Sequence, residues 1–504
     1  MTIVGFEMRH LGVFILTLFF VALAGSIAAI DWPVFRDSVY KPIGNSYAGY
    51  QCFGDPCTPY MHTGIDIMAP PGVPVFAVEA GYVKAILTTS AETHWRVVIG
   101  DSAGTAESDA WMYAHVDYIS IVNNAGLHVG DWVEEGRYIG DVVQWTVNDF
   151  NHLHFSKIRY AGDSAQWENN WPDWVFVGNP LDEFDATADP DAPVFENAHG
   201  DARFALCRNQ SSTYFTPGET ISGDVDIVCR VYDYVNTHTY RTVPYSVEYN
   251  IDQGSAGPWV PGICFTGEIG VYADFGTLTP VVYRDDYVCD TRGDYGMQEC
   301  YLNITNADGD SLFELSDRPC SWHTADFTNG GHTIYVRARD KGGNETIDSM
   351  TVTAANYFSL SGTILLADEV PQPLAGTIVT VMETGQSDTT DAAGSFALSG
   401  MGGGSQVIRA SRAGFVAADT SLVMNQNRAL EISLLPGGYV AGDANTDGTA
   451  NVGDVVYLIT FVFKGGLPPF PYAAGDANGD GMANVADAVY LVSYIFKGGP
   501  PPQG

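Results

Sequence analysis

Residues 61–70 read MHTGIDIMAP, and this stretch places an imidazole at His62 and a carboxylate at Asp66, four positions apart. Gly64 stands between them and lets the backbone bend, so that both side chains can turn toward one point. Zinc binds nitrogen and carboxylate oxygen ligands of this kind, and in catalytic sites it leaves one position open for water. The stretch therefore predicts one part of a metal site.

Two segments farther along the chain supply more imidazoles. In His152-Leu153-His154 the alternation of a β-strand places both histidines on one face and the leucine on the other. Residues 111–116, WMYAHV, also have the composition of a strand and add His115. His94 and His128 belong to no such pattern, and we interpret them as surface or structural residues.

The order His-x-Gly-x-Asp, Tyr-Ala-His and His-x-His resembles the lysostaphin/LytM type of zinc metallopeptidase. This resemblance implies an antiparallel β domain in which one Zn²⁺ ion is bound by three side chains: His62, Asp66 and His154. It also implies that His115 and His152 stay unligated and act on the metal-bound water and the developing oxyanion.

The resemblance covers about residues 42–184 and has two departures. Asp149-Phe150-Asn151 stands where the family usually has a Gly-Pro pair, and Ser156 stands where an acidic residue often follows. We expect both departures to affect substrate fit more than metal binding. Cys52 and Cys57 flank a turn-forming segment, and their bridge would stiffen the approach to His62. A cysteine ligand to the zinc is the alternative.

The beginning of the chain has the pattern of a secretory signal peptide, over residues 1–29. An apolar run from Leu11 to Ala24 is followed by small residues suited to cleavage. We therefore expect a secreted or cell-surface attached protein that is not an integral membrane protein after signal cleavage. A retained membrane anchor is the alternative.

The composition excludes several partners. A formal net charge of -37, from 23 basic and 60 acidic residues, argues against nucleic acid and against a polybasic membrane-surface mode. Acidity of this kind serves solubility outside the cell or collects carboxylates for calcium. All 8 cysteines lie after the signal segment, an even number that fits an oxidising compartment.

A chain of 504 residues exceeds one core, and we expect a mainly β, multidomain protein. The predicted segments are a zinc metallopeptidase domain (30–185), a disulfide-rich immunoglobulin-like β-sandwich (194–355), a carboxypeptidase regulatory-like β-sandwich (356–436) and a small α dockerin-like domain (438–504).

The second domain shows short alternating runs typical of an antiparallel sandwich, such as residues 225–232. Its end, residues 331–344, resembles the last strands of bacterial immunoglobulin-like domains. The stretch 252–320 is either an elaborated binding loop or a stapled insertion. Six cysteines lie in this domain, and their pairing stays open: Cys207, Cys229, Cys264, Cys289, Cys300 and Cys320.

The third domain has alternating runs at residues 360–364, 374–381 and 410–415. A turn at residues 391–394 joins two further strands, and the set resembles the carboxypeptidase regulatory-like sandwich. This domain carries no catalytic constellation in its sequence. We interpret it as a spacer, with adhesion as the alternative.

The last domain contains an internal repeat, GDANTDG at 442–448 and GDANGDG at 475–481. Each copy has calcium-loop spacing, with oxygen side chains at positions one, three and five, a carbonyl at seven and a carboxylate at twelve. We expect two structural Ca²⁺ ions, bound by Asp443, Asn445, Asp447, Thr449 and Asp454 in one copy and by Asp476, Asn478, Asp480, Met482 and Asp487 in the other.

Aspartate at position twelve and a single following helix in each copy resemble a dockerin. The resemblance implies a cohesin-like partner. The positions that dockerins use for docking are here Val452-Gly453 and Val485-Ala486, which are small or apolar. A calcium-stabilised terminal cap without a partner is the alternative.

Three functions remain for the whole chain. The favoured one is a secreted zinc-dependent metalloendopeptidase that hydrolyses peptide bonds in peptidoglycan cross-bridges or stem peptides. The second is a general extracellular protease. The third is a non-catalytic surface or scaffold protein that is attached through its dockerin-like module.

Overall fold

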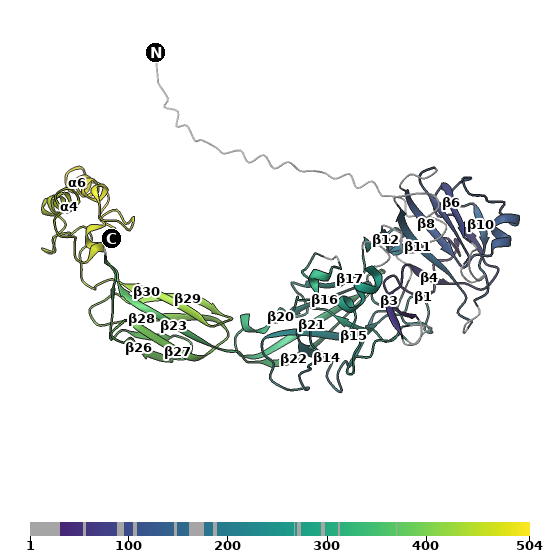
Figure 1. Cartoon of the computed structure of the whole chain (residues 1–504), viewed down its shortest axis with the longest axis horizontal. Helices are drawn as coiled ribbons and strands as arrows, with labels where there is room; N and C mark the ends of the chain where they lie inside the picture. Colours follow the sequence, from purple (N-terminus) through teal and green to yellow (C-terminus); the bar gives the residue numbers. More distant parts are fainter. Residues whose placement is uncertain are drawn as a thin grey trace, which may run out of the picture.

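The computed structural model describes residues 31–53, 57–87, 95–103, 108–145, 149–160, 176–184, 189–266, 268–269, 274–293, 298–310, 313–368 and 370–503. The predicted signal peptide and His94 lie outside the described residues. Four modules follow one another along an extended arc, with the first module, the predicted peptidase domain, at one end and a helical module at the other (Figure 1). Within the described part of the chain, no helix is both long and apolar enough to span a bilayer.

The peptidase domain is built on one large sheet whose central strands run in the order β1-β4-β11-β8-β7-β6-β9. Their bounds are β1 (Ile43–Asn45), β4 (Ile65–Met68), β11 (His152–Tyr160), β8 (Ser108–Ala114), β7 (Arg96–Gly100), β6 (Gly81–Leu87) and β9 (Trp132–Val133). β12 (Phe176–Gly178) pairs with β11 at the side. All these pairs are antiparallel, as the sequence predicts.

Smaller elements complete this domain. Two further antiparallel pairs complete it: the hairpin of β2 (Tyr50–Phe53) and β3 (Thr58–Met61), and the pair of β5 (Pro74–Phe76) with β10 (Tyr138–Asp141), whose strands are distant in sequence. Two short helical turns, η2 (Ser120–Asn124) and η4 (Pro180–Asp182), connect the strands.

The second module is a two-sheet β structure. One sheet contains β13 (Val194–Glu196), β14 (Phe204–Arg208), β15 (Asp224–Tyr232), β19 (Tyr301–Asn303) and β20 (Trp322–His323). The other contains β16 (Ser246–Ile251), β17 (Val260–Cys264), β21 (Gly330–Arg339) and β22 (Glu345–Ala354). The short helices are α2 (Asp274–Thr277), α3 (Thr279–Val282), η5 (Leu315–Asp317) and η6 (Thr324–Asp326).

The peptidase domain and the second module share one hydrophobic core. Ile43 and Phe155 from the first belong to the same buried cluster as Ile227 and Val336 from the second. β18 (Glu268–Ile269) of the second module pairs with β12 and so extends the peptidase sheet. The two modules therefore form one packed unit, although a sequence boundary separates them.

The cysteines differ from expectation. Cys52 and Cys57 form a disulfide between β2 and β3, as predicted. The six cysteines of the second module are free, so its predicted disulfide-rich character is not what the structure shows. Burial explains how thiols fit there, because Cys229, Cys289 and Cys300 are fully enclosed and pack as small apolar side chains. Burial also raises the pKa of the Cys300 thiol to about 12.

The third module has its own core and two sheets. One holds β23 (Tyr357–Leu366), β24 (Gln372–Pro373), β27 (Ser395–Gly402) and β30 (Arg428–Leu434), and the other holds β25 (Ile378–Val381), β26 (Ser387–Thr389), β28 (Gly404–Ser411) and β29 (Ala418–Met424). β23 and β30 pair in parallel. The β-rich, many-sheeted architecture agrees with the predicted fold class, while the family resemblances of the second to fourth modules stay predictions.

The fourth module is helical and packs around a small core. Its helices are α4 (Val452–Lys464), α5 (Tyr472–Gly475) and α6 (Val485–Lys497). Asn451 and Asn484 cap the two long helices in matching capping boxes. A left-handed glycine ends each of them, Gly465 and Gly498. The sequence repeat is therefore also a structural repeat.

Candidate metal centre

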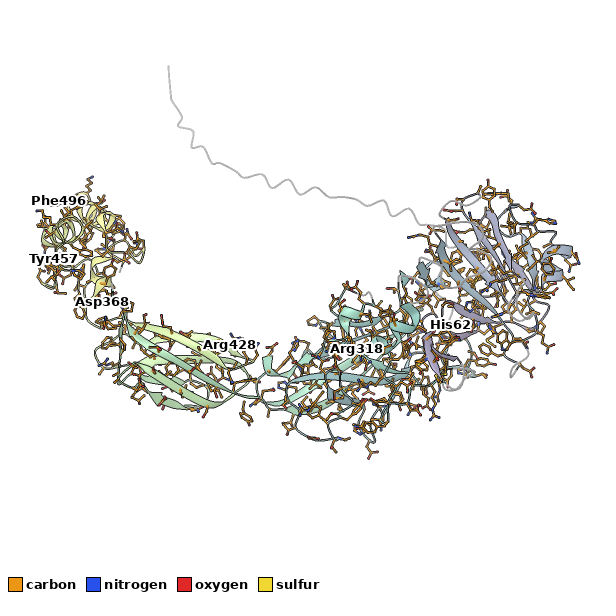
Figure 2. All side chains as sticks on the ribbon, viewed as in Figure 1. His62, Arg318, Asp368, Arg428, Tyr457 and Phe496 are labelled. Carbon is orange, nitrogen blue, oxygen red and sulfur yellow. A yellow bond between two sulfur atoms is a disulfide. The ribbon has the colours of Figure 1, made fainter. Side chains whose placement is uncertain are left out.

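Strand register brings the predicted ligands together. β11 lies between β4 and β8 in the sheet, and His154 is the direct partner of Asp66 across the β4–β11 pair. His62 lies just before β4, and it is placed on the side of the peptidase domain that faces the second module (Figure 2). His152 and His154 share one face of β11, while Leu153 is fully buried on the other.

The three predicted zinc ligands converge on one point. His62 Nε2 lies 2.9 Å from His154 Nδ1 and 3.2 Å from Asp66 Oδ1. His154 Nδ1 lies 3.0 Å from the same carboxylate oxygen. Tetrahedral ligands about 2.1 Å from a zinc ion stand about 3.4 Å apart. The spacing and the chemistry of these three atoms therefore fit one zinc ion.

The outer nitrogen of each ligating histidine is occupied. His62 Nδ1–H donates to the Ser46 carbonyl at 3.0 Å, which leaves Nε2 free for a metal. His154 Nε2–H donates to Ser156 Oγ at 3.0 Å, so Nδ1 is the nitrogen that faces His62 and Asp66. Partners of this kind fix the tautomer and the orientation of metal-binding imidazoles. Ser156 is fully buried, so it orients a ligand and does not line a substrate cleft.

Gly64 is required by close packing. A Cβ atom there would lie 2.4 Å from the Phe155 carbonyl oxygen and 2.4 Å from Ser156 Oγ. The absence of a side chain thus lets the segment before β4 approach β11 and brings His62 within reach of His154. The bend expected from the sequence is present, and close approach is the stronger reason for glycine.

The two predicted catalytic histidines lie beside the ligands. His152 Nδ1–H donates to the Phe150 carbonyl at 2.7 Å, and its Nε2 lies 3.5 Å from Asp66 Oδ1. The His115 ring centroid lies 4.5 Å from that of His152. His115 has a φ of 66°, a left-handed conformation that is uncommon for residues other than glycine. Backbone strain at such a position is typical of functional sites.

Electrostatics favours the ligand forms of these groups. Burial lowers the pKa of the His154 imidazole to about 4 and also lowers that of His152. Burial acts to raise the pKa of Asp66, but the charges of His152 and His62 and the hydrogen bond from His154 outweigh it and hold that pKa well below its usual value. Neutral imidazoles beside an ionised carboxylate are the forms that bind a metal.

Two aromatic side chains close the site. The Phe150 ring packs against His152 at 4.6 Å and against Tyr240 of the second module at 5.1 Å. Trp145 packs against His115 at 4.6 Å. Phe150, one of the departures from the family pattern, therefore joins the metal centre to the second module.

Comparison with known proteins agrees with this geometry. Residues 60–166 match peptidase family M23. The chain therefore carries a peptidase M23 domain, and M23 peptidases use zinc. Curated proteins contain no match to the chain.

Several solved structures resemble part of the chain. The catalytic domain of the antimicrobial peptidase lysostaphin from Staphylococcus simulans is 21% identical, covers 25% of this chain and 85% of its own, and has a TM-score of 0.20. The catalytic domain of the M23 protein EnpA from Enterococcus faecalis is 23% identical, covers 27% of this chain and 98% of its own, and has a TM-score of 0.19. A zinc-containing peptidase from Vibrio cholerae is 22% identical, covers 27% of this chain and 40% of its own, and has a TM-score of 0.20. At these TM-scores the likenesses carry no argument of their own.

The C-terminal repeats form two similar loops. In the second loop, oxygens of Asp476, Asp480 and Asp487 lie within 4.8 Å of one another. Asp476 Oδ2 accepts the Gly481 backbone N–H at 2.7 Å, and the equivalent bond in the first loop joins Gly448 to Asp443. Among the described residues, the first loop does not form a carboxylate group this tight.

The remaining predicted calcium ligands also lie in these loops. Asn445 and Asn478 each donate a backbone N–H to the carboxylate at position twelve, at 3.0 and 3.1 Å. Asp447 and Asp480 accept from the residue at position seven, which is Thr449 in one loop and Met482 in the other. Asp454 and Asp487, at position twelve, are fully buried.

Sequence reasoning missed some residues of the metal centre. Ser156 was read as a substrate position, yet the two-residue period of the strand places it on the face of His152 and His154. Ser46 contributes only a backbone carbonyl, for which no sequence signal exists. Trp145 lies outside every motif and is found only from its packing.

Proposed function

We propose that the chain is a secreted zinc-dependent metalloendopeptidase that hydrolyses peptide bonds of bacterial peptidoglycan. The observation that carries the proposal is the convergence of His62 Nε2, Asp66 Oδ1 and His154 Nδ1 within 3.2 Å. The family M23 match over residues 60–166 supports the reaction class. The sequence resemblance to the lysostaphin/LytM type, whose members usually cut peptide bonds of bacterial cell walls, supports the substrate.

His62, Asp66 and His154 would hold the zinc ion. Zinc in such a site supplies Lewis acidity to a scissile carbonyl and to water. His152 is suited to accept a proton at Nε2, because its Nδ1–H is committed to Phe150 and burial keeps the ring neutral. His115, beside it, is suited to donate a hydrogen bond to an oxyanion.

One observation favours a second function. The four histidines of the centre are 3% to 8% exposed, and Phe150 is 5% exposed and packs against His152. A peptidase needs room for a chain of substrate at its metal. The same domain without that room would bind zinc and serve as a non-catalytic surface protein.

A digestion experiment separates these functions. Purified full chain is incubated with peptidoglycan, and the released fragments are identified by mass spectrometry. We expect new amino termini at peptide bonds, lost on chelation and restored by zinc. His115→Ala should abolish them, while the exposed His128→Ala serves as the matched control. Intact walls after long incubation with zinc-loaded protein would favour the non-catalytic function, and cleavage of casein without walls a general protease.

We further propose that the C-terminal module binds two Ca²⁺ ions and docks on a cohesin-like partner. Exposed apolar side chains occupy equivalent positions on its two long helices: Val456 is 59% and Val489 64% exposed, and Phe463 and Phe496 are each 66% exposed. These pairs are related by the sequence repeat, and Phe496 lies on the outer surface of the module (Figure 2). Paired apolar stripes favour a partner over a terminal cap.

The partner is tested by calorimetry of the full chain with purified cohesin domains. We expect binding only in the presence of calcium, and weaker binding for Phe463→Ser and Phe496→Ser. Tyr439→Ser, outside the stripes, is the control. Calcium uptake without any cohesin binding would leave the terminal cap as the function of this module.

A further inference from the structure

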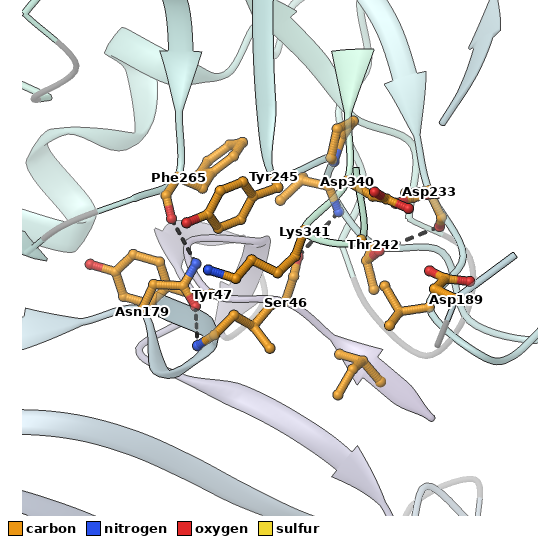
Figure 3. A pocket seen from close by; sticks show the side chains of 16 residues that line it. Ser46, Tyr47, Asn179, Asp189, Asp233, Thr242, Tyr245, Phe265, Asp340 and Lys341 are labelled. Carbon is orange, nitrogen blue, oxygen red and sulfur yellow. Dashed lines mark hydrogen bonds between the residues drawn. The ribbon is translucent and has the colours of Figure 1, made fainter. Parts of the chain in front are cut away.

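The junction between the peptidase domain and the second module holds three carboxylates that the zinc centre does not use. Asp189 lies in the segment before β13, Asp233 follows β15 and Asp340 follows β21. One oxygen of each lies within 4.8 Å of the others. Asp233 is 1% exposed and Asp340 is 6% exposed. Figure 3 shows the three side chains together at one end of the junction cavity.

No basic side chain neutralises this group among the described residues that line the cavity. Lys341 is the one basic residue of that lining. Its ammonium nitrogen lies 5.0 Å from the ring centre of Tyr245, and Figure 3 shows it directed away from the carboxylates. Burial and the neighbouring Asp340 accordingly raise the pKa of Asp233 to about 8. Three buried carboxylates without a cation repel one another.

Asp189 gives independent evidence for a ligand. Its Oδ2 atom is buried and accepts no hydrogen bond, while its Oδ1 atom accepts the backbone N–H of Asp191. The side-chain amide of Asn236, whose backbone hydrogen bonds to Asp189, also has both polar atoms buried without a hydrogen-bond partner. Buried polar atoms in native proteins nearly always have partners, so the unpaired carboxylate oxygen of Asp189 and the unpaired amide of Asn236 beside it call for a ligand.

The size and chemistry of the site select the ligand. The cavity measures about 30 Å³, which is room for one ion or water molecule and too little for an organic ligand. The three ligand atoms of the group are all carboxylate oxygens. Hard cations with flexible oxygen coordination, calcium above all, prefer this set, whereas zinc prefers nitrogen and sulfur.

We propose that Asp189, Asp233 and Asp340 bind one Ca²⁺ ion that fixes the second module to the peptidase domain. Asp189 belongs to the segment between the two modules, and Asp233 and Asp340 follow strands β15 and β21 of the second module. The ion would therefore tie the connecting segment to the ends of these two strands.

The peptidase side of the cavity reaches the zinc centre through one residue. Ser46 lines the cavity, and its Oγ accepts the Val243 backbone N–H of the second module at 3.1 Å. Its carbonyl accepts the Nδ1–H of His62 at 3.0 Å. Ile43, three residues earlier, bonds to Val235 at 3.0 Å. Calcium at this junction would therefore hold the segment directly after β1, whose Ser46 carbonyl orients the zinc ligand His62.

The test counts calcium sites on the full chain. Protein freed of calcium is titrated with CaCl₂ by calorimetry, for the unmodified chain, Asp233→Asn, Asp189→Asn and the exposed control Asp201→Asn. We expect each junction variant to bind one calcium fewer than the unmodified chain and than the control. The comparison is by difference, so it does not depend on how many sites the C-terminal loops contribute. Equal numbers in all four proteins would overturn the proposal.

Thermal unfolding gives a second readout. Saturating calcium should raise the melting temperature of the zinc-loaded peptidase unit by about 5 to 10 °C at one hundred times Kd, and Asp233→Asn should lose that rise. Without calcium, Asp233→Asn should be at least as stable as the unmodified chain, because it removes one repelling charge. If Asp233→Asn lowers the melting temperature equally with and without calcium, Asp233 is a structural residue that shares a proton with its neighbouring carboxylates, and the calcium proposal is wrong.

If neither variant folds, crystals of the unmodified chain grown with CaCl₂ decide the question. We expect anomalous density within about 2.6 Å of all three carboxylates. Its absence in calcium-saturated crystals would overturn the proposal.

Discussion

The zinc centre and the C-terminal loops gather polar side chains in opposite ways. In the zinc centre His62 and His154 are 92 residues apart in sequence, and their nitrogens meet at 2.9 Å only because β4 and β11 pair in one register. In the second C-terminal loop the carboxylates come from one short segment, Asp476 to Asp487. The first kind of site exists only in the folded sheet. The second kind comes from one continuous stretch of sequence, so its side chains are close together before the rest of the module folds.

Loss of a zinc ligand should have the largest effect. We expect Asp66→Ala to bind no zinc at the centre and to lose at least about 1000-fold in peptidoglycan hydrolysis, since metal activation contributes several kcal/mol to the barrier. Zinc content and fragment release measure the two effects. Calcium uptake by the C-terminal module should be unchanged. If Asp66→Ala still hydrolyses peptidoglycan, the zinc centre does not depend on all three predicted ligands.

Loss of a catalytic imidazole should come next. We expect His152→Ala to retain zinc and to lose about 10²- to 10⁴-fold in kcat, because general acid-base help of this size is removed. His128→Ala, with an exposed ring, is the matched control. Zinc loss in His152→Ala would instead assign this residue to the ligands.

Ser156→Ala should have a smaller effect on the same centre. The substitution leaves His154 Nε2–H buried without its partner, and we expect zinc affinity to fall about 10- to 100-fold. Competition with a chromogenic chelator measures it, and Ser156→Thr should recover part of the loss. An unchanged affinity would show that the strand alone orients His154.

These residues also show how far the sequence reaches. The alternation in β11 predicts that His152 and His154 share a face, and the same period places Ser156 on that face. The family pattern instead led us to expect that Ser156 affects substrate fit. The two C-terminal loops follow from spacing along one segment, and calcium binding by them stays a prediction; only the second loop gathers its three carboxylates within 4.8 Å among the described residues. Asp189, Asp233 and Asp340 have no motif, since three separate segments bring them together.

The cysteines and the domain boundary are two features that the sequence alone did not predict correctly. Counting cysteines predicted a stapled second module, whereas burial among apolar neighbours accommodates the free thiols of Cys229 and Cys300. Linker composition predicted separate domains near residue 185. The pairing of β12 with β18 and the shared core depend on surfaces that only the folded chain creates.

Acid should weaken the metal-free centre moderately. The folded pKa of His154 is about 4, below the unfolded value of about 6.5, so unfolded chains bind more protons between these values. This contribution to stability is complete above about pH 6.5 and is lost as the pH falls to about 4. The lowered pKa of His152 acts in the same direction. The stability that Asp66 contributes is complete above its own unfolded pKa and is lost only as the pH falls below that value.

Unfolding of chelated protein by urea at several pH values measures this effect. The difference in unfolding free energy between the unmodified chain and His154→Asn should shrink between pH 6.5 and 4. A difference that does not depend on pH would contradict a neutral, buried His154.

The smallest effect on catalysis is expected from the C-terminal loops. Asp454→Ala combined with Asp487→Ala should abolish calcium binding there and destabilise α4 and α6, because both residues complete capping boxes. Hydrolysis of soluble peptidoglycan fragments should stay within about twofold of the unmodified chain, since the C-terminal module lies at the opposite end of the arc from β4 and β11 (Figure 1). Rates on soluble and intact walls measure the difference.

The most direct test of the central claim is anomalous X-ray diffraction from zinc-loaded crystals at the zinc absorption edge. We expect one strong peak about 2.0 to 2.2 Å from His62 Nε2, Asp66 Oδ1 and His154 Nδ1. Zinc at a different set of side chains, with these three atoms unligated, would contradict the account.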